Sequence, residues 1–126
     1  LSRSNVGQST VVGMGADPVV FTNLPELLTL FEEDTETDGV IVVGEVGGEQ
    51  EERAAAFISE RMKKPVAVYI AGRFSPKGKR MGHAGAIVRG AAGTVEGKME
   101  ALKEAGVSVL ESPWEVSRWA VENRLQ

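Results

Sequence analysis

His83, the only histidine among 126 residues, is the side chain best suited to chemistry. It lies in the stretch Gly82-His83-Ala84-Gly85, where small neighbours offer little bulk for packing and let a ligand approach the ring closely. Cationic residues stand just upstream and would attract an anion to the same place. The composition of this loop therefore predicts a histidine that acts as a nucleophile toward phosphorus.

Glu45 is the carboxylate that could support such a histidine. The stretch Gly44-Glu45-Val46-Gly47-Gly48 leaves the end of a predicted buried strand, and the His83 loop follows the next predicted strand. Because the carboxyl ends of parallel strands meet at one edge of a sheet, we expect Glu45 to lie near His83. A carboxylate on one ring nitrogen fixes the tautomer and leaves the other nitrogen free to attack. The alternative is a turn whose glutamate points to water.

Other interpretations of the His83 loop compete with this one. His83 could be a solvated loop residue, and Lys77, Lys79 and Arg80 suit solubility as well as they suit phosphate steering. A metal site is disfavoured because the sequence has no second histidine and no cysteine, so we predict no metal ligand. A serine hydrolase is disfavoured because the sequence has no G-x-S-x-G motif.

Composition limits the class of protein. The chain has the length of one domain, and its 14 basic and 18 acidic residues give a net charge of −4, which argues against a nucleic-acid partner. The charges between Glu45 and Lys64 alternate in sign and predict a solvated helix face. No apolar run approaches the roughly 18 residues needed to span a bilayer, and no signal-like segment opens the chain, so we expect no membrane association.

Predicted strands alternate with predicted helices along the chain. Short apolar runs predict strands over residues 10–15, 39–44, 66–71 and 107–110. Cap and stop signals predict helices over residues 24–31, 49–64 and 94–105, and a last helix after the capping box Ser112-Pro113-Trp114-Glu115. The stretch from Gly72 to Gly93 has no period, as is typical of a functional or disordered loop. This order predicts an α/β fold, a flavodoxin-like three-layer parallel sheet with helices on both faces.

Several motifs together carry a resemblance to a known family. They are Gln8-Ser9-Thr10, Gly13-Met14-Gly15-Ala16-Asp17-Pro18, Gly44-Glu45-Val46-Gly47-Gly48 and Pro76-Lys77-Gly78-Lys79-Arg80-Met81-Gly82-His83-Ala84-Gly85-Ala86-Ile87, followed by Gly93-Thr94, Lys98, Ala101-Leu102, Ala105-Gly106-Val107 and Ser112-Pro113. In this order they resemble the ligase domain of the succinyl-CoA synthetase α subunit. The resemblance runs from about Val6 to the end of the chain.

The resemblance implies a reaction and a set of roles. His83 matches the histidine that is phosphorylated and passes the phosphoryl group between nucleotide and acid, and Glu45 matches the glutamate that holds its ring. Residues 1–126 would form the phosphohistidine-bearing ligase domain of an NDP-forming ligase that makes succinyl-CoA. The phosphate would be bound by Gly82, Ala84, Gly85 and Ser4.

The same resemblance implies partners that this chain would not supply. They are an ATP-grasp β subunit, succinate, CoA, and ATP or GTP with Mg in the full complex. No cofactor is expected on this chain alone, and the isolated chain is expected to be inactive. The location would be the cytoplasm, or the mitochondrial matrix for a eukaryotic source.

The chain departs from the family pattern in two places. These residues match only the ligase domain, so we expect the N-terminal CoA-binding Rossmann domain of the family to be absent from this chain, and the junction Ser4-Asn5 stands where family members carry a helix-length segment. If that junction is a true deletion, the sheet lacks its first strand–helix segment. Two alternatives therefore stay open. One is a malate– or citrate–CoA ligase of the same family, and the other is a truncated, non-catalytic domain that serves subunit assembly.

Overall fold

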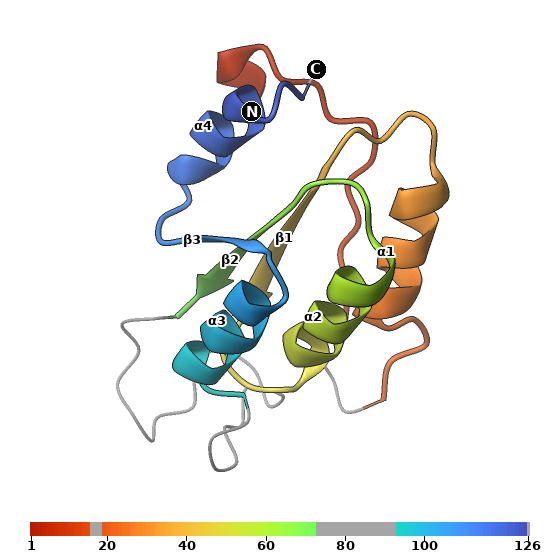
Figure 1. Cartoon of the computed structure of the whole chain (residues 1–126), viewed down its shortest axis with the longest axis vertical. Helices are drawn as coiled ribbons and strands as arrows, with labels where there is room; N and C mark the ends of the chain where they lie inside the picture. Colours follow the sequence, from red (N-terminus) through yellow and green to blue (C-terminus); the bar gives the residue numbers. More distant parts are fainter. Residues whose placement is uncertain (16–18, 73–92, 126) are drawn as a thin grey trace.

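The computed structural model describes residues 1–15, 19–72 and 93–125. Three parallel strands form its sheet in the order β1-β2-β3, namely β1 (Val40–Glu45), β2 (Val66–Ala71) and β3 (Ser108–Leu110). A short 3-10 helix η1 (Ser2–Ser4) and the helices α1 (Leu24–Glu33), α2 (Gln50–Arg61), α3 (Val95–Glu104) and α4 (Glu115–Glu122) complete the described elements. A helix precedes each strand or links it to the next (Figure 1), as a parallel sheet requires.

The central strand β2 sends alternate side chains to two apolar cores, because successive residues of a strand point to opposite faces. Val66, Val68 and Ile70 pack with α1, α2 and α3 on one face. Ala67 and Tyr69 face the other core, which α4 covers with Trp119 and Ala120. In Figure 1, α4 lies apart from the other three long helices. Helices on both faces of a parallel sheet confirm the predicted α/β class.

The predicted ends of α1 and α3 are formed by the residues expected to cap them. Asn23 accepts a hydrogen bond from the Glu26 N–H at 3.0 Å, and the Glu26 carboxylate accepts one from the Asn23 N–H at 2.9 Å. This is the reciprocal bonding of a capping box. Thr94 caps α3 through the Gly97 N–H at 3.0 Å. Gly106 follows α3 with a φ of 78°, a left-handed conformation that favours glycine.

The strand predicted over residues 10–15 is not formed. These residues adopt no regular structure, and the Val11 side chain is 81% exposed. Within the described part of the chain, only β2 pairs with β1, so the other edge of β1 has no strand partner. A cleft of about 1360 Å³ separates residues 7–15 from β1 and α1. The short apolar run lines this cleft and does not pair with the open edge of β1.

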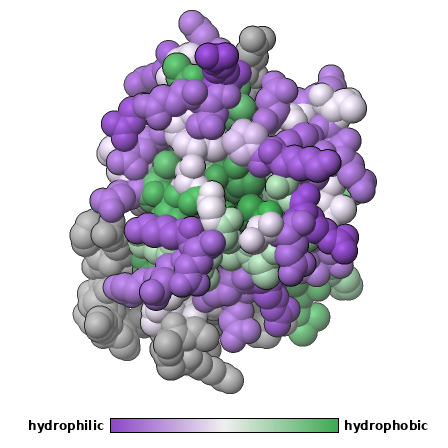
Figure 2. Space-filling model, viewed as in Figure 1, coloured by the Kyte–Doolittle hydropathy of each residue, from purple (hydrophilic) through white to green (hydrophobic). Residues whose placement is uncertain are grey.

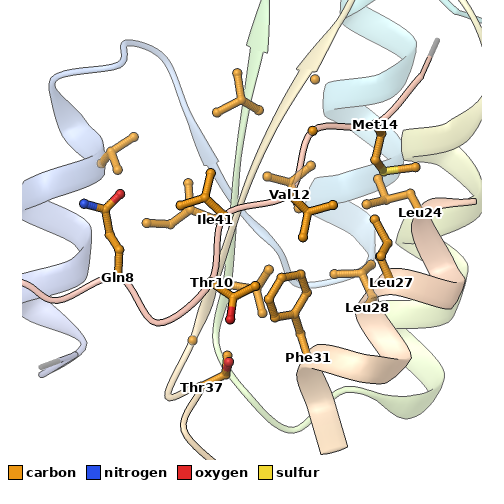
Figure 3. Close-up of a pocket in the computed structure, with 18 of the residues that line it drawn as sticks. Gln8, Thr10, Val12, Met14, Leu24, Leu27, Leu28, Phe31, Thr37 and Ile41 are labelled. Atoms are coloured by element: carbon orange, nitrogen blue, oxygen red, sulfur yellow. The ribbon is translucent and has the colours of Figure 1, made fainter. Parts of the chain in front are cut away.

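Figure 3 shows this cleft from within. Val12 and Met14 lie on one side, and Leu28 and Phe31 of α1 lie on the other. The lining is mainly apolar, and Ile41 of β1 forms part of its floor. The cleft extends along β1 as far as the turn that follows this strand.

Two further boundaries differ from the prediction. The helix predicted to reach Lys64 ends at Arg61, because the backbone becomes extended and the N–H groups of Lys63 and Lys64 donate to the Glu32 carboxylate instead. The Ser112 capping box is not formed either. The Glu115 carboxylate accepts from the Glu111 N–H at 2.8 Å.

The described helices are all short. None of those within residues 1–15, 19–72 and 93–125 combines the length and apolar character needed to cross a membrane.

Candidate functional site at the carboxyl edge of the sheet

Glu45 is the last residue of β1 and opens the glycine-rich turn over residues 45–49. In the register of the sheet it stands opposite Ala71, the last residue of β2. The turn bends through Gly47 and Gly48, whose φ values are 86° and 63°. The structure therefore places Glu45 at the carboxyl edge of the sheet, beside the end of the next strand.

Gly93 attaches to the same turn from further along the chain. Its carbonyl accepts a hydrogen bond from the Gly47 N–H at 2.9 Å. A side chain at Gly93 would meet the Gly48 carbonyl oxygen at 2.9 Å, and its φ of 75° also favours glycine. Ala71 precedes the stretch that contains His83 and Gly93 follows it, and both residues lie beside Glu45 and its turn.

Lys98 and Glu51 form an ion pair beneath this turn. The Lys98 side chain has no exposed surface, and only 9% of the Glu51 side chain is exposed. The Lys98 ammonium contacts the Glu51 carboxylate and also donates to the Gly47 carbonyl at 2.6 Å. A buried ammonium needs such partners, because its transfer from water costs several kcal/mol.

The second oxygen of Glu51 reaches the start of the turn. It accepts a hydrogen bond from the Glu45 N–H at 3.3 Å. The carboxylate occupies the space where a side chain at residue 44 would stand, and a Cβ on Gly44 would collide with it. Gly44 is therefore required here for space, because it lets a buried carboxylate lie against the backbone.

Glu52 of α2 binds the backbone at Gly93, on the far side of the turn from Glu45. One of its oxygens accepts from the Gly93 N–H at 3.0 Å. The other oxygen is buried and has no hydrogen-bond partner among the described residues. Glu51 and Glu52 thus hold the backbone on the two sides of the turn, at Glu45 and at Gly93.

Two helix N-termini at this edge favour an anion, whereas the carboxylates of Glu45 and Glu52 oppose one. Helix α2 begins at Gln50, directly after the turn, and α3 begins at Val95, two residues after Gly93. The N-terminus of a helix carries a partial positive charge and unsatisfied N–H groups. Two such termini start beside one glycine-rich turn, an arrangement that can bind phosphate.

The structure describes only some of the predicted site residues. His83, Gly82, Ala84 and Gly85 lie outside the described residues, as do Lys77, Lys79 and Arg80. Glu45 lies at the predicted edge, half-buried. Ser4 is not brought to it, since η1 lies with α4 at the opposite end of the molecule in Figure 1. A phosphate role for Ser4 stays a prediction of the resemblance alone.

Lys98 and Glu51 are not among the predicted site residues. Both occupy positions of an inward-facing helical stripe. Lys98 lies between the buried Val95 and Leu102 of α3, and Glu51 precedes the buried Ala54 in α2. A charged residue at the spacing of a buried apolar stripe is the signal that could have identified them. The alternating charges of α2 were instead interpreted as a solvated face.

The fold and the turn define the class of protein. It is a parallel α/β domain with a glycine-rich turn and two helix N-termini at the carboxyl edge of its sheet. The model of the CoA-ligase family matches residues 1–110, and the chain belongs to this family. It is similar to ADP-forming succinate–CoA ligase α subunits. The identity is 54% over 112 residues for subunit α 1 of Archaeoglobus fulgidus, covering 89% of this chain and 38% of the relative.

Two further relatives extend the comparison. The α subunit from Aquifex aeolicus is 49% identical over 113 residues, covering 90% of this chain and 37% of the relative. The one from Staphylococcus epidermidis is 45% identical over 122 residues, covering 97% and 40%. The chain therefore spans about two fifths of the length of these relatives.

Solved structures share the fold. A variant ATP citrate lyase of Methanosaeta concilii, in complex with (3S)-citryl-CoA, superposes with a TM-score of 0.77 at 23% identity. The match covers 86% of this chain and 18% of that one. ATP citrate lyase from Methanothrix soehngenii, in complex with citrate and coenzyme A, gives the same values. At this identity the likeness concerns the fold alone.

Proposed function

We propose that this chain is the phosphohistidine-bearing ligase domain of an NDP-forming acid–CoA ligase with succinate as its acid. Membership of the CoA-ligase family and the likeness to succinate–CoA ligase α subunits support this proposal. The single observation that carries it is that residues on both sides of the His83 stretch contact Glu45 or its turn. Ala71, before that stretch, pairs with Glu45 in the sheet, and the Gly93 carbonyl, after it, accepts a hydrogen bond from the Gly47 N–H of the turn.

His83 would act as a nucleophile in two transfers. One ring nitrogen attacks the terminal phosphorus of the nucleotide, so a P–N bond forms and the bond to the NDP oxygen breaks. A carboxylate oxygen of succinate then attacks the same phosphorus, and the P–N bond breaks to give succinyl phosphate. The thiol of CoA attacks the acyl carbon, loses its proton and displaces phosphate.

Glu45 would hold the other ring nitrogen through its N–H. This contact fixes the tautomer and stabilises the positive charge that develops when the ring is phosphorylated. The N-termini of α2 and α3, at Gln50 and Val95, would stabilise the transferred phosphate. These groups would position the histidine ring and neutralise the charge of the phosphate, which is most of what phosphoryl transfer requires.

The nucleotide, Mg and CoA would be bound elsewhere in a larger assembly that includes an ATP-grasp β subunit. Apolar side chains on this chain offer contact surface for such a partner, among them Phe21 and Trp114. Figure 2 shows an apolar area within a mostly hydrophilic face of the molecule. The assembly would work in the cytoplasm, or in the mitochondrial matrix of a eukaryote.

The proposal is tested by phosphorylation of the complex. The chain is combined with its β subunit and a nucleotide carrying labelled terminal phosphate, and acid-labile, base-stable label is measured on the chain. Label should appear on the wild-type chain and be absent from His83→Asn. Retention of the label in that variant would overturn the proposal.

The acid is tested separately. The full complex is supplied with succinate, malate or citrate, and CoA-ester formation is compared. Succinate should give the fastest reaction. A faster reaction with malate or citrate would identify one of the related ligases and leave the phosphohistidine step unaffected.

The cleft beside β1 and the exposed Val11 favour a second candidate, a domain that serves only subunit assembly. Such a domain would bind the β subunit without accepting label. Equal affinity of the wild-type and His83→Asn chains for the β subunit, with no label on either, would support this candidate.

A further inference from the structure

We propose that Lys98 and Glu51 are positioning residues that set the orientation of Glu45 toward the histidine. This inference rests on the proposed function, because it concerns the group that is to hold the reacting ring. Neither residue lies in the glycine-rich turn or in the His83 loop. They act from two helices beneath the turn, α3 and α2.

The first argument is where their hydrogen bonds go. Lys98 donates to the Gly47 carbonyl at 2.6 Å, and Glu51 accepts from the Glu45 N–H at 3.3 Å. One ion pair therefore holds the backbone of the turn at two points that enclose residue 46. A backbone held at Glu45 and at Gly47 fixes the direction of the Cα–Cβ bond from which the Glu45 side chain extends.

The second argument is the burial of the pair. A buried ion pair contributes little net stability, because the desolvation of two charges offsets their attraction. Lys98 nevertheless lies in the apolar stripe of α3 between Val95 and Leu102, where a leucine or methionine would pack without that cost. Its interactions with the turn give a reason for the ammonium that the packing of the core does not supply.

The third argument is steric. The Glu51 carboxylate fits against the strand end only because residue 44 has no side chain. The contact with the Glu45 N–H therefore depends on the missing side chain at residue 44, and Lys98 holds the other oxygen of the same carboxylate.

The inference is tested by labelling rates in the complex with the β subunit. Two variants remove the ammonium, Lys98→Met and the double variant Lys98→Met/Glu51→Gln, which leaves no unpaired buried charge. Folding of each is checked by circular dichroism before the assay. Arg118→Met removes a charge from an exposed ion pair with Glu115 and Glu122 and serves as the matched control.

We expect the double variant to form phosphohistidine about tenfold to a hundredfold more slowly, since a small displacement of a positioned group has an effect of this order. Arg118→Met should keep the wild-type rate. The decisive readout is the combination with Glu45→Gln. If the pair acts through Glu45, the combined variant loses no more than Glu45→Gln alone, whereas independent effects would multiply.

The outcomes separate this inference from the proposed function. Absence of label on the wild-type chain contradicts the proposed function itself. Normal label on the wild-type chain, together with a wild-type rate in Lys98→Met/Glu51→Gln or with multiplied effects in the combination, overturns the inference alone. Failure of both Lys98 variants to fold would also overturn it, because the pair would then be required for the fold itself.

Discussion

Lys98 of α3 and Glu51 of α2 form an ion pair in which the lysine side chain has no exposed surface. The pair joins two neighbouring helices below the carboxyl edge of the sheet (Figure 1). Its remaining hydrogen bonds go to the backbone of the turn that follows β1. A link between two helices and the turn that bears Glu45 should affect stability, and under the proposed function it should also affect activity.

Removing one member of this pair should destabilise the fold. Lys98→Met leaves the Glu51 carboxylate buried without its counter-ion, and we expect the free energy of unfolding to fall by about 3–5 kcal/mol. Lys98→Met/Glu51→Gln should fall by less, because no buried charge is left. Urea unfolding measures both. Equal losses in the two variants would contradict the assignment of the cost to an unpaired charge.

Gly44 should not tolerate a side chain. In Gly44→Ala the new methyl group collides with the Glu51 carboxylate, and we expect a loss of about 1–3 kcal/mol. Gly13→Ala is the matched control, because a Cβ at Gly13 meets no atom within 4 Å. That change should alter stability by less than about 0.5 kcal/mol. The two midpoints of urea unfolding are compared, and a harmless Gly44→Ala would refute the steric argument.

Glu52 should stabilise the attachment of Gly93 through one oxygen only. Glu52→Ala removes the acceptor of the buried Gly93 N–H and should cost about 1–3 kcal/mol. Glu52→Gln keeps an amide oxygen for that N–H and removes a partly buried charge, so it should cost less than the alanine. Thermal unfolding ranks the two variants, and the reverse order would show that the charge itself is needed.

Asp34 gives the chain a stability contribution that depends on pH. Hydrogen bonds from the Thr37 hydroxyl at 2.6 Å and from the Glu36 N–H at 3.1 Å, with the nearby Lys64 charge, lower the pKa of Asp34 below its ordinary value of 3.8. The carboxylate form therefore contributes stability above that value, and this contribution is lost as the pH falls through the lower folded pKa.

The difference in unfolding free energy between wild type and Asp34→Asn should follow this pattern. It should be constant near neutral pH and shrink below pH 3.8. Thr37→Val removes the largest cause, so an NMR titration of that variant should place the pKa of Asp34 closer to its ordinary value. An unchanged titration would assign the shift to the other two groups.

The parallel sheet could be predicted because its signals are local. The apolar strands over residues 40–45 and 66–71, the Asn23 cap and the glycine after α3 each act through neighbours in sequence. Residues 10–15 carry the same apolar signal and form no strand. Strand formation also requires hydrogen bonds to a neighbouring strand, and an apolar run does not say whether these bonds form with the open edge of β1.

The site could be predicted in part. Glu45 follows a predicted strand, and in a parallel sheet such a residue lies at the carboxyl edge, where ligands bind. The hydrogen bonds from Lys98 to Glu51 and Gly47, and from Gly93 to Glu52, join residues 41 to 51 positions apart. Such contacts depend on how α2 and α3 pack together, and helical periodicity gives only the weaker hint that two charged residues face inward.

The central claim is that His83 carries the phosphoryl group above the Glu45 turn. Its most direct test is fragmentation mass spectrometry, under non-acidic conditions, of the chain taken from a working complex with nucleotide. The account predicts phosphate on the His83 ring and much less of it in Glu45→Gln. Phosphate on another residue, or none during turnover, would contradict the account.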